Sequence, residues 1–464
     1  LKETRPVRGL RSPLEPAINH PNPWEGGLWR PRDIAEIEMI ASRSLLKLAA
    51  KHREHYLKNF LELNRATLKP LPDEPQAYVM TAGQPNTETI ARFLQILMWQ
   101  GIEVHQMTRE LWFKHDKAID EYHEMPLGSF IVFVNQPKKQ NVLSLFERQT
   151  YPDRIGADGT PDTPYDVAGW TLPLQMGIES DVVWDTQDLE KFRNTLKPVT
   201  SIDQARAVMN LGPVKEPFAK VPNPLKNPAR IGLYKGWAGS MDEGWTRLVL
   251  DTHHIKYDSV GDPAVRSGDL AKYDVILLPS IGDNGLLRGL SADRYPEEFT
   301  GGMGTEGIAN IKRWVENGGR LVCFDASCGT VIKEFGLPIK NILSGVNRRE
   351  FYNPGSVVKL EVDLRHPLAR NTLEETPAYF TNSSAFEVTG ESVAPVGRIR
   401  AVAYYANRNA LMSGWMLGEK MINAKPALLE AAYGKGSIVL FAFRPQHRGQ
   451  TWATFPFIFN TLEK

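Results

Sequence analysis

The strings DVILLPS (residues 274–280) and RLVCFDASCGT (residues 320–330) decide the fold of this chain. Each begins with a short, continuous apolar run, which is typical of a strand buried on both faces of a parallel sheet. Between them, GIANIKRWVENG (307–318) has apolar residues at helical spacing and ends at a Gly-Gly pair, a good helix stop. Strand, crossover helix and strand form a βαβ unit, so the sequence predicts a parallel α/β sheet.

The end of the second string is a candidate reactive turn. The residues Ala326-Ser327-Cys328-Gly329-Thr330 are predicted to lead from the strand into a helix. Several α/β enzymes present a nucleophile between small residues at such a turn. Cys328 is therefore a candidate nucleophile, and the alternative is a small buried residue without a catalytic role.

Changes in composition divide the rest of the chain. Residues 1–30 are rich in Pro and Arg and are predicted to be an extended tail. Residues 31–182 combine one long helix (32–68) with a small α/β domain. Residues 183–228 contain six prolines and are interpreted as a linker. Residues 229–464 predict a doubly wound, flavodoxin-like α/β domain with added β-strands towards its end.

Composition excludes some classes of function. The 464 residues carry a net charge of +1, so charge alone gives no reason to expect nucleic-acid binding. No apolar run approaches the roughly 18 residues of a membrane span. Cys323 and Cys328 are the two cysteines, and their spacing does not favour a disulfide. So few cysteines fit the cytoplasm and also the bacterial periplasm.

Histidine spacing gives no metal site. The ten histidines include no H-E-x-x-H and no H-x-x-E pair, and zinc sites usually draw two ligands from such a short spacing. His52 and His55 share one face of a charged helix, which more often faces solvent. We therefore expect no metal ligands in this chain.

Polar residues follow the last apolar strand of the chain. Cys328 and His447 each come after a strand of the predicted sheet, so both are expected near its carboxyl edge as a candidate thiol–imidazole pair. Arg444, Arg448 and Gln450 lie beside His447 and are candidate binding residues. The alternative for this cluster is a salt-bridged surface between domains.

Several strings are specific enough to carry a family resemblance. They are INHPNPWEGGLWRPRDI (18–34), PYDVAGWTLPLQMG (164–177), GLYKGWAGSMDEGWTRLVLD (232–251), LSADRYPEEFTGGMGTEG (290–307), EFGLP (334–338) and LFAFRPQHRGQT (440–451). The chain resembles, over nearly its whole length, the C-terminal region of a bacterial subgroup of zinc carboxypeptidases. In that subgroup a metallocarboxypeptidase domain precedes a middle region and a class I glutamine amidotransferase-like domain.

The resemblance implies that the zinc domain, with its H-x-x-E pair and a distant His, precedes Leu1. Residues 1–30 would then be its tail, and Glu3-Thr4-Arg5 matches the E-x-R context of the family's general base, with Arg5 as a binding residue. The chain itself would carry no cofactor, and the parent would hold zinc and act on peptide or protein substrates. A periplasmic or secreted location is also implied. The class I amidotransferase triad places a Glu two residues after its His, where this chain has Gly449.

Three hypotheses follow. The first is a noncatalytic C-terminal portion of a carboxypeptidase-like protein, accessory or structural in role. The second is an amidotransferase-like or cysteine hydrolase domain that uses Cys328 and His447. The third is a carbohydrate- or peptide-binding module, suggested by the 11 tryptophans and the Gly-rich insertion at 282–306.

Overall fold

The structure is a computed structural model that describes residues 15–18, 21–23, 27–81, 83–119, 121–186, 192–213 and 221–464. The chain divides into two compact units, Leu1–Lys69 and Pro70–Lys464. Most of the predicted extended tail lies outside the described residues.

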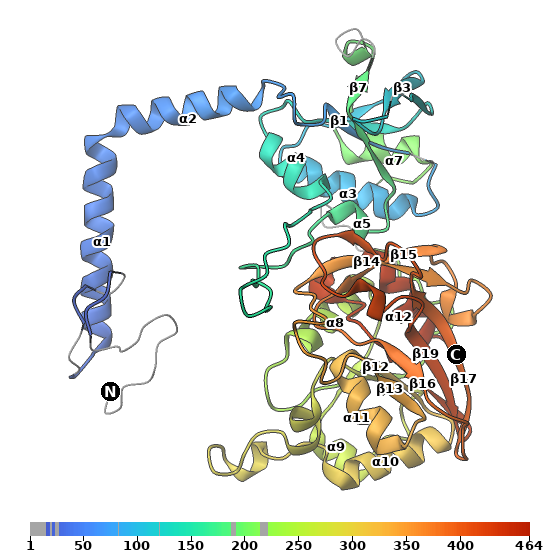
Figure 1. Ribbon diagram of the computed structural model, residues 1–464. Coiled ribbons are helices and arrows are strands. Elements are labelled where there is room, and N and C mark those ends of the chain that lie inside the picture. Colours follow the sequence, from blue (N-terminus) through green and yellow to red (C-terminus); the bar gives the residue numbers. More distant parts are fainter. Residues whose placement is uncertain are drawn as a thin grey trace. The chain divides into compact units, whose positions relative to one another are not determined.

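The first unit contains two helices where the sequence predicts one. They are α1 (Pro31–Lys51) and α2 (Arg53–Thr67), and the helix breaks at His52, whose φ and ψ are −110° and 23° (Figure 1). Pro31 occupies the first turn of α1, and the Asp33 carboxylate accepts a hydrogen bond from the Arg30 N–H at 2.8 Å. No residue of either helix is buried.

The second unit begins with the predicted small α/β domain. Its five-stranded antiparallel sheet has the order β6-β1-β5-β2-β8, and a separate sheet has the order β4-β3-β7. The elements are β1 (Ala77–Met80), α3 (Thr87–Trp99), β2 (His105–Gln106), β3 (Leu111–Lys114), β4 (His123–Met125), β5 (Phe130–Phe133), α4 (Lys139–Phe146), α5 (Leu172–Gln175), β6 (Ser180–Val183), β7 (Asp185–Thr186), β8 (Lys197–Pro198) and α7 (Ile202–Val208). Apolar residues of α3 are buried against this sheet, as their helical spacing predicts.

The predicted linker of residues 183–228 needs correction. Its first part supplies β7, β8 and α7 to the small domain, and α7 packs on α3. The two-residue strand β8 lies at the edge of the sheet, where Pro198 does not interrupt a ladder. Strands this short leave no periodicity in a sequence, and their prolines therefore resemble those of a connecting segment.

The large domain confirms the predicted fold class: a doubly wound, amidotransferase-like and flavodoxin-like α/β domain with added strands. Its five parallel strands have the order β10-β9-β11-β12-β20, the flavodoxin-like order 2-1-3-4-5. The elements of this half are β9 (Ile231–Tyr234), α8 (Met241–Thr252), β10 (Asp258–Val260), α9 (Asp262–Ser267), β11 (Val275–Leu278), η1 (Asn284–Arg288), η2 (Glu297–Phe299), α10 (Gly304–Glu316), β12 (Arg320–Phe324) and α11 (Ala326–Phe335). Figure 1 shows α10 and α11 beside the strands of this sheet.

Antiparallel strands extend the same sheet beyond β20. The path continues through β19, β17, β14 and β15, and β18 pairs with β14, so the sheet has ten strands. The remaining elements are β13 (Ile339–Asn341), β14 (Ser356–Val362), η3 (Pro367–Ala369), β15 (Glu375–Phe380), β16 (Phe386–Val388), β17 (Val396–Tyr405), β18 (Leu411–Ser413), η4 (Glu419–Met421), β19 (Pro426–Tyr433), β20 (Gly436–Phe441), η5 (His447–Gly449), η6 (Trp452–Thr454) and α12 (Phe455–Thr461). The predicted hairpin joins β19 to β20 through Gly434, whose φ is +57°.

Candidate functional site

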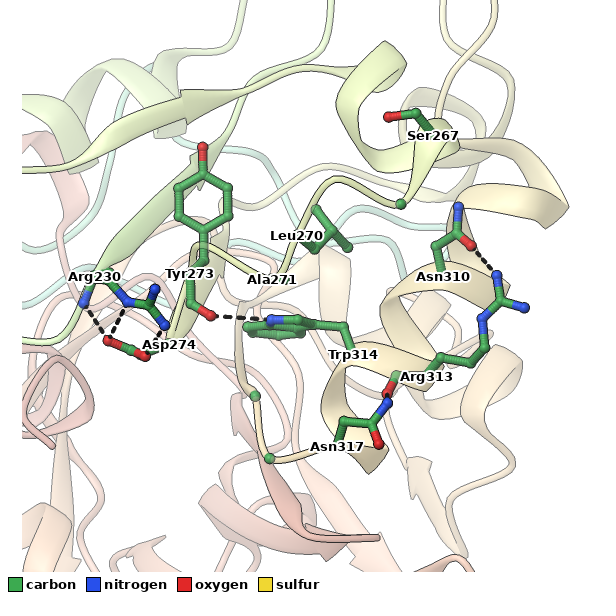
Figure 2. Close-up of a pocket in the computed structure, with 13 residues that line it drawn as sticks. Arg230, Ser267, Leu270, Ala271, Tyr273, Asp274, Asn310, Arg313, Trp314 and Asn317 are labelled. Atoms are coloured by element: carbon green, nitrogen blue, oxygen red, sulfur yellow. Dashed lines mark hydrogen bonds and ion pairs between the residues drawn. The ribbon is translucent and has the colours of Figure 1, made fainter.

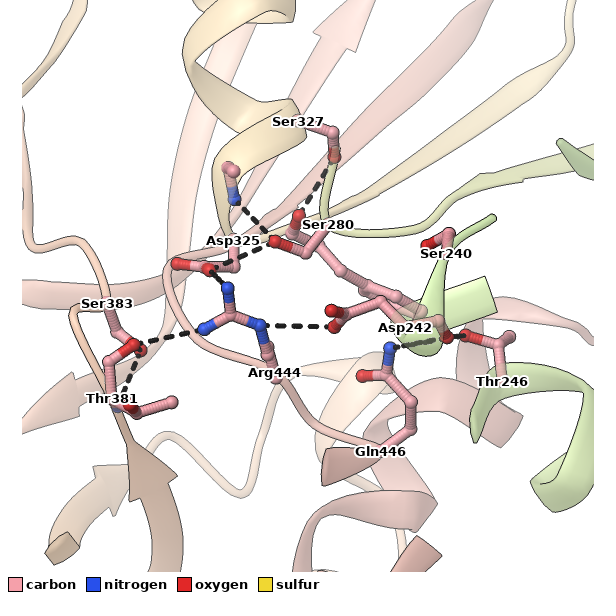
Figure 3. Close-up of polar contacts among 12 residues, drawn as sticks. Ser240, Asp242, Thr246, Ser280, Asp325, Ser327, Thr381, Ser383, Arg444 and Gln446 are labelled. Carbon is pink, nitrogen blue, oxygen red and sulfur yellow. Dashed lines mark hydrogen bonds and ion pairs between the residues drawn. The ribbon is translucent and has the colours of Figure 1, made fainter. Parts of the chain in front are cut away.

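The carboxyl edge of the parallel strands brings four polar side chains together. Doubly wound sheets form their sites at this edge, near the point where the strand order reverses, here between β9 and β11. Asp242 follows β9 in the first turn of α8, and Ser280 follows β11. Asp325 follows β12, and Arg444 follows β20. Figure 3 shows all four side chains meeting at this edge.

The sharp turn after β12 is centred on Asp325. This residue has φ +46° and ψ −108°, a conformation that costs a non-glycine residue about 1–3 kcal/mol. Its N–H donates to Phe441 O at 2.8 Å, and α11 begins at the next residue. The sequence prediction placed this turn around Cys328 and was wrong by three positions, because β12 ends at Phe324 and Cys328 lies inside α11.

Arg444 joins the two carboxylates of the site. Its Nη2 lies 2.8 Å from Oδ2 of Asp325, and its Nε lies 3.1 Å from Oδ1 of Asp242. Its Nη1 donates to Thr381 O at 3.0 Å, so the guanidinium has contacts on three sides. Ser280 Oγ donates to Asp325 Oδ2 at 3.1 Å. We name these four residues, Asp242, Ser280, Asp325 and Arg444, the elbow cluster.

Burial sets the protonation of the elbow cluster. The side chain of Asp325 is 3% exposed, and burial raises its pKa to about 6 against the opposing effect of Arg444. Burial also raises the pKa of Asp242, again opposed by Arg444. Two buried carboxylates on one guanidinium leave one negative charge uncompensated when both ionise, and proton uptake by one of them removes it.

Cys328 is a buried thiol in α11. It is fully buried, and its Sγ lies 3.2 Å from Phe441 O and 3.4 Å from Cys323 O. The S–H group can donate a hydrogen bond to either of these carbonyl oxygens. Burial raises its pKa well above the ordinary range. The thiolate is the reactive form of cysteine, so this environment suppresses nucleophilic character.

His447 packs among aromatic rings. Its ring stacks on Tyr379 with centroids 4.0 Å apart, and meets Trp245 edge-on at 4.8 Å. Burial, together with Arg448 and Arg444, lowers its pKa to about 3, so the ring is neutral at pH 7. Within the described part of the chain, neither ring nitrogen has a hydrogen-bond partner. A general base of a thiol would need a bond to that thiol and a second group to orient its ring.

The environment of Cys328 gives a direct prediction. Iodoacetamide at pH 7 should leave Cys328 and Cys323 unmodified in the folded chain and should alkylate both in urea, as peptide mass spectrometry will report. The variant Ser344→Cys, which carries a thiol at an exposed position, should be alkylated in the folded chain and serves as the positive control. Rapid labelling of Cys328 in the folded chain would contradict this description of the site.

The other predicted site residues have different locations. Arg448 is exposed and places its guanidinium carbon 5.3 Å from the ring centroid of Trp170. Gln450 lines a separate cavity near Trp170. Glu3 and Arg5 lie outside the described residues. The alternative prediction placed Arg444 at a salt-bridged surface between domains. Arg444 does not form such a surface, because its two ion-pair partners belong to the large domain itself.

Among the described residues, no group of three or more His, Cys, Asp or Glu side chains is placed to hold a metal ion. None of their helices is both long enough and apolar enough to cross a membrane.

A further cavity, of about 580 Å³, lies at the amino edge of the parallel strands, opposite the elbow cluster (Figure 2). There Arg230 pairs with Asp274 at 2.6 Å, and Trp314 Nε1 donates to Tyr273 O at 3.2 Å. Asn310 is held by the backbone of residues 265 and 266 and by Arg313. Because these polar groups already bond to each other, and sites of such sheets form at the carboxyl edge, we assign this cavity a structural origin.

Comparison with known proteins gives distant structural likenesses. No family model matches the chain, and no curated protein matches it. A cytoplasmic protein from Salmonella typhimurium LT2 is 15% identical with a TM-score of 0.32, covering 50% of this chain and 99% of its own. A ThuA-like protein from Bacteroides uniformis is 12% identical with a TM-score of 0.30, covering 53% and 93%. A beta-galactosidase from Bacillus circulans sp. alkalophilus is 12% identical with a TM-score of 0.30, covering 50% and 31%. The resemblance to zinc carboxypeptidases stays a prediction.

Sequence reasoning did not single out Asp242 and Asp325 as site residues. Asp242 was interpreted as a favourable acid in the first turn of a helix, which it also is. The available signal for Asp325 was a carboxylate directly after a buried strand. The small residues that follow it led to the prediction of Cys328 as the site residue instead.

Proposed function

We propose that this chain is a noncatalytic module, the C-terminal portion of a zinc carboxypeptidase-like protein, with an accessory role in substrate binding or in stability. The quoted sequence strings support the parentage. The observation that carries the noncatalytic role is Arg444, which bridges Asp242 and Asp325 directly at the elbow.

The elbow cluster keeps the side chain at its turn out of reach of a substrate. A nucleophile at a strand-to-helix turn acts because its side chain is exposed at the top of the sheet. Here the side chain at the turn is 3% exposed and is held by Arg444. A substrate could reach it only by displacing a buried ion pair, and separating such a pair costs about 3–5 kcal/mol.

The second candidate is an amidotransferase-like or hydrolase activity of Cys328 with His447. The sequence favours this candidate, since Cys328 stands among small residues shortly after β12, but the turn itself is at Asp325, three residues earlier. Its thiol, however, lies against the carbonyl oxygens of Cys323 in β12 and Phe441 in β20, and Gly449 stands where the triad acid is expected. The alkylation experiment above distinguishes the two candidates.

Assays of the purified chain test the proposal further. A zinc peptidase uses the metal to polarise the scissile carbonyl and to lower the pKa of its water, which Glu3 alone cannot replace. We expect the chain to bind no zinc stoichiometrically, by elemental mass spectrometry, and to release no C-terminal residues from peptides. We expect the natural polypeptide that carries this chain to release them in a chelator-sensitive manner.

Each outcome of these assays bears on one part of the proposal. Stoichiometric zinc together with carboxypeptidase activity in the chain alone would overturn its noncatalytic role. Glutamine hydrolysis that is lost in Cys328→Ala would establish the second candidate instead. A natural polypeptide without chelator-sensitive carboxypeptidase activity would refute the parentage.

A further inference from the structure

A cavity of about 350 Å³ lies where the small domain meets the end of the large domain. Its volume is at the small end of the range of about 300–1,000 Å³ for ligand pockets. It is lined by seven residues: Ser144, Leu145, Gln149, Trp170, Leu172, Gln175 and Gln450. None of these side chains is charged, so the lining is suited to a neutral ligand.

One lining amide has an unsatisfied acceptor. Gln175 is 4% exposed, and its Nε2 donates to the carbonyl oxygen of Trp170. That bond fixes the orientation of the amide, because a carbonyl oxygen can only accept. Gln175 Oε1 is then left buried without a partner in the described chain. A buried acceptor without a donor costs about 1–3 kcal/mol, and a ligand hydroxyl would supply the missing donor.

Two further amides add hydrogen-bonding capacity. Gln149 Oε1 accepts a hydrogen bond from the backbone N–H of Trp170 at 3.0 Å, which leaves its Nε2 group as a donor with no bond to the described residues. The Gln450 side chain makes no hydrogen bond within the described part of the chain. The three glutamines therefore offer both acceptors and donors to one small space.

The remaining lining is apolar and aromatic. Trp170 is half-buried, and Leu145 and Leu172 line the same cavity. Arg448 stacks over the indole of Trp170, with its guanidinium carbon 5.3 Å from the ring centroid, and so helps to hold the ring in place. The face of an aromatic ring is its negative part, and it attracts weakly positive C–H groups.

We propose that this cavity binds a neutral sugar. A sugar ring has hydroxyl groups on its rim, each both donor and acceptor, and C–H groups on its faces. The rim matches the three glutamine amides, and the faces match Trp170 and the two leucines. The site shares no residue with the elbow cluster, and the proposal is independent of the carboxypeptidase parentage.

The test is a titration of the full chain with a panel of neutral mono- and disaccharides. Tryptophan fluorescence and calorimetry measure the binding. Concentrations reach about 10 mM, at which a site with a Kd of about 1 mM is nearly saturated. Gln450→Leu keeps the side-chain size and breaks no bond within the described chain, and it should weaken binding about threefold to tenfold. Trp170→Ala should weaken binding about tenfold or more.

Matched controls separate binding from folding. Gln140→Leu, at an exposed position of α4 outside the cavity, and Trp112→Ala, at an exposed position of β3, should bind as the unaltered chain does. Circular dichroism and urea unfolding show whether Trp170→Ala has folded. If Trp170→Ala does not fold, the affinity of Gln450→Leu for the sugars still tests the proposal. No sugar binding up to about 10 mM, equal loss in the controls, or binding of neutral peptides in place of sugars would each overturn the proposal.

Discussion

Replacing Arg444 with methionine is expected to lower the free energy of unfolding by about 3–5 kcal/mol at pH 7. Methionine preserves much of the side-chain volume and removes the charge that faces Asp242 and Asp325. Both carboxylates are largely buried, with side chains 13% and 3% exposed, so they would remain as unpaired charges or would have to take up protons. Urea unfolding followed by circular dichroism measures the change.

The comparison variant is Arg365→Met. Arg365 also pairs with a carboxylate, at 2.8 Å from Asp363, but its side chain is 91% exposed. Water screens such a pair, and the free energy of unfolding should be almost unchanged. The loss in Arg444→Met should shrink as the pH falls through about 6, the pKa of Asp325 in the folded chain, because a protonated carboxyl group no longer needs the arginine. Equal small effects of both variants would show that Arg444 does not neutralise buried charge.

The variant Asp325→Asn is expected to change how stability depends on pH. Burial raises the pKa of Asp325 from 3.8 to about 6 in the folded chain. Between these values the folded state binds more protons than the unfolded state, so the free energy of unfolding falls as the pH rises. With these two pKa values, about 2 kcal/mol of stability is lost between pH 4 and pH 7. Asparagine does not titrate, and the variant should lack this contribution.

The quantity to measure is the difference between the two unfolding curves as a function of pH. His447, whose pKa is lowered to about 3, contributes with the opposite sign in both proteins, and subtraction removes that contribution. Asp363→Asn is the control, because Arg365 lowers the pKa of Asp363 and the contribution of that residue also has the opposite sign. A difference that stays flat from pH 4 to pH 7 would refute a raised pKa at Asp325.

Much of the large domain could be predicted because its signals are local. The apolar runs at residues 275–278 and 320–324 form β11 and β12, and the stripe of Ile308, Ile311 and Val315 in α10 is buried. β15 was not predicted, although most of its residues are buried, because Pro377 and Thr376 interrupt its apolar pattern. Its position in the sheet comes from pairing with β14, which is a contact between distant residues.

The candidate site was harder to predict for the same reason. Arg444 meets Asp242 and Asp325 although the three follow different strands, far apart in the sequence. No spacing rule connects them, and only the order of the strands brings the three residues to one edge. Gln450 was singled out as a binding residue from its polar neighbours, but the cavity that it lines depends on Gln149 and Gln175 of another domain.

The backbone at Asp325 has a consequence for protein engineering. Its strained turn is maintained by an ion pair and by a hydrogen bond to the Phe441 carbonyl oxygen. Neither contact depends on a catalytic role for this residue. A designer who wants a nucleophile at such a turn has to create the turn first. This chain already contains the turn, and its contact with Phe441 uses the backbone N–H of residue 325, which a change of side chain leaves in place. Asp325 and Arg444 would have to be exchanged together, so that neither is left as a buried unpaired charge.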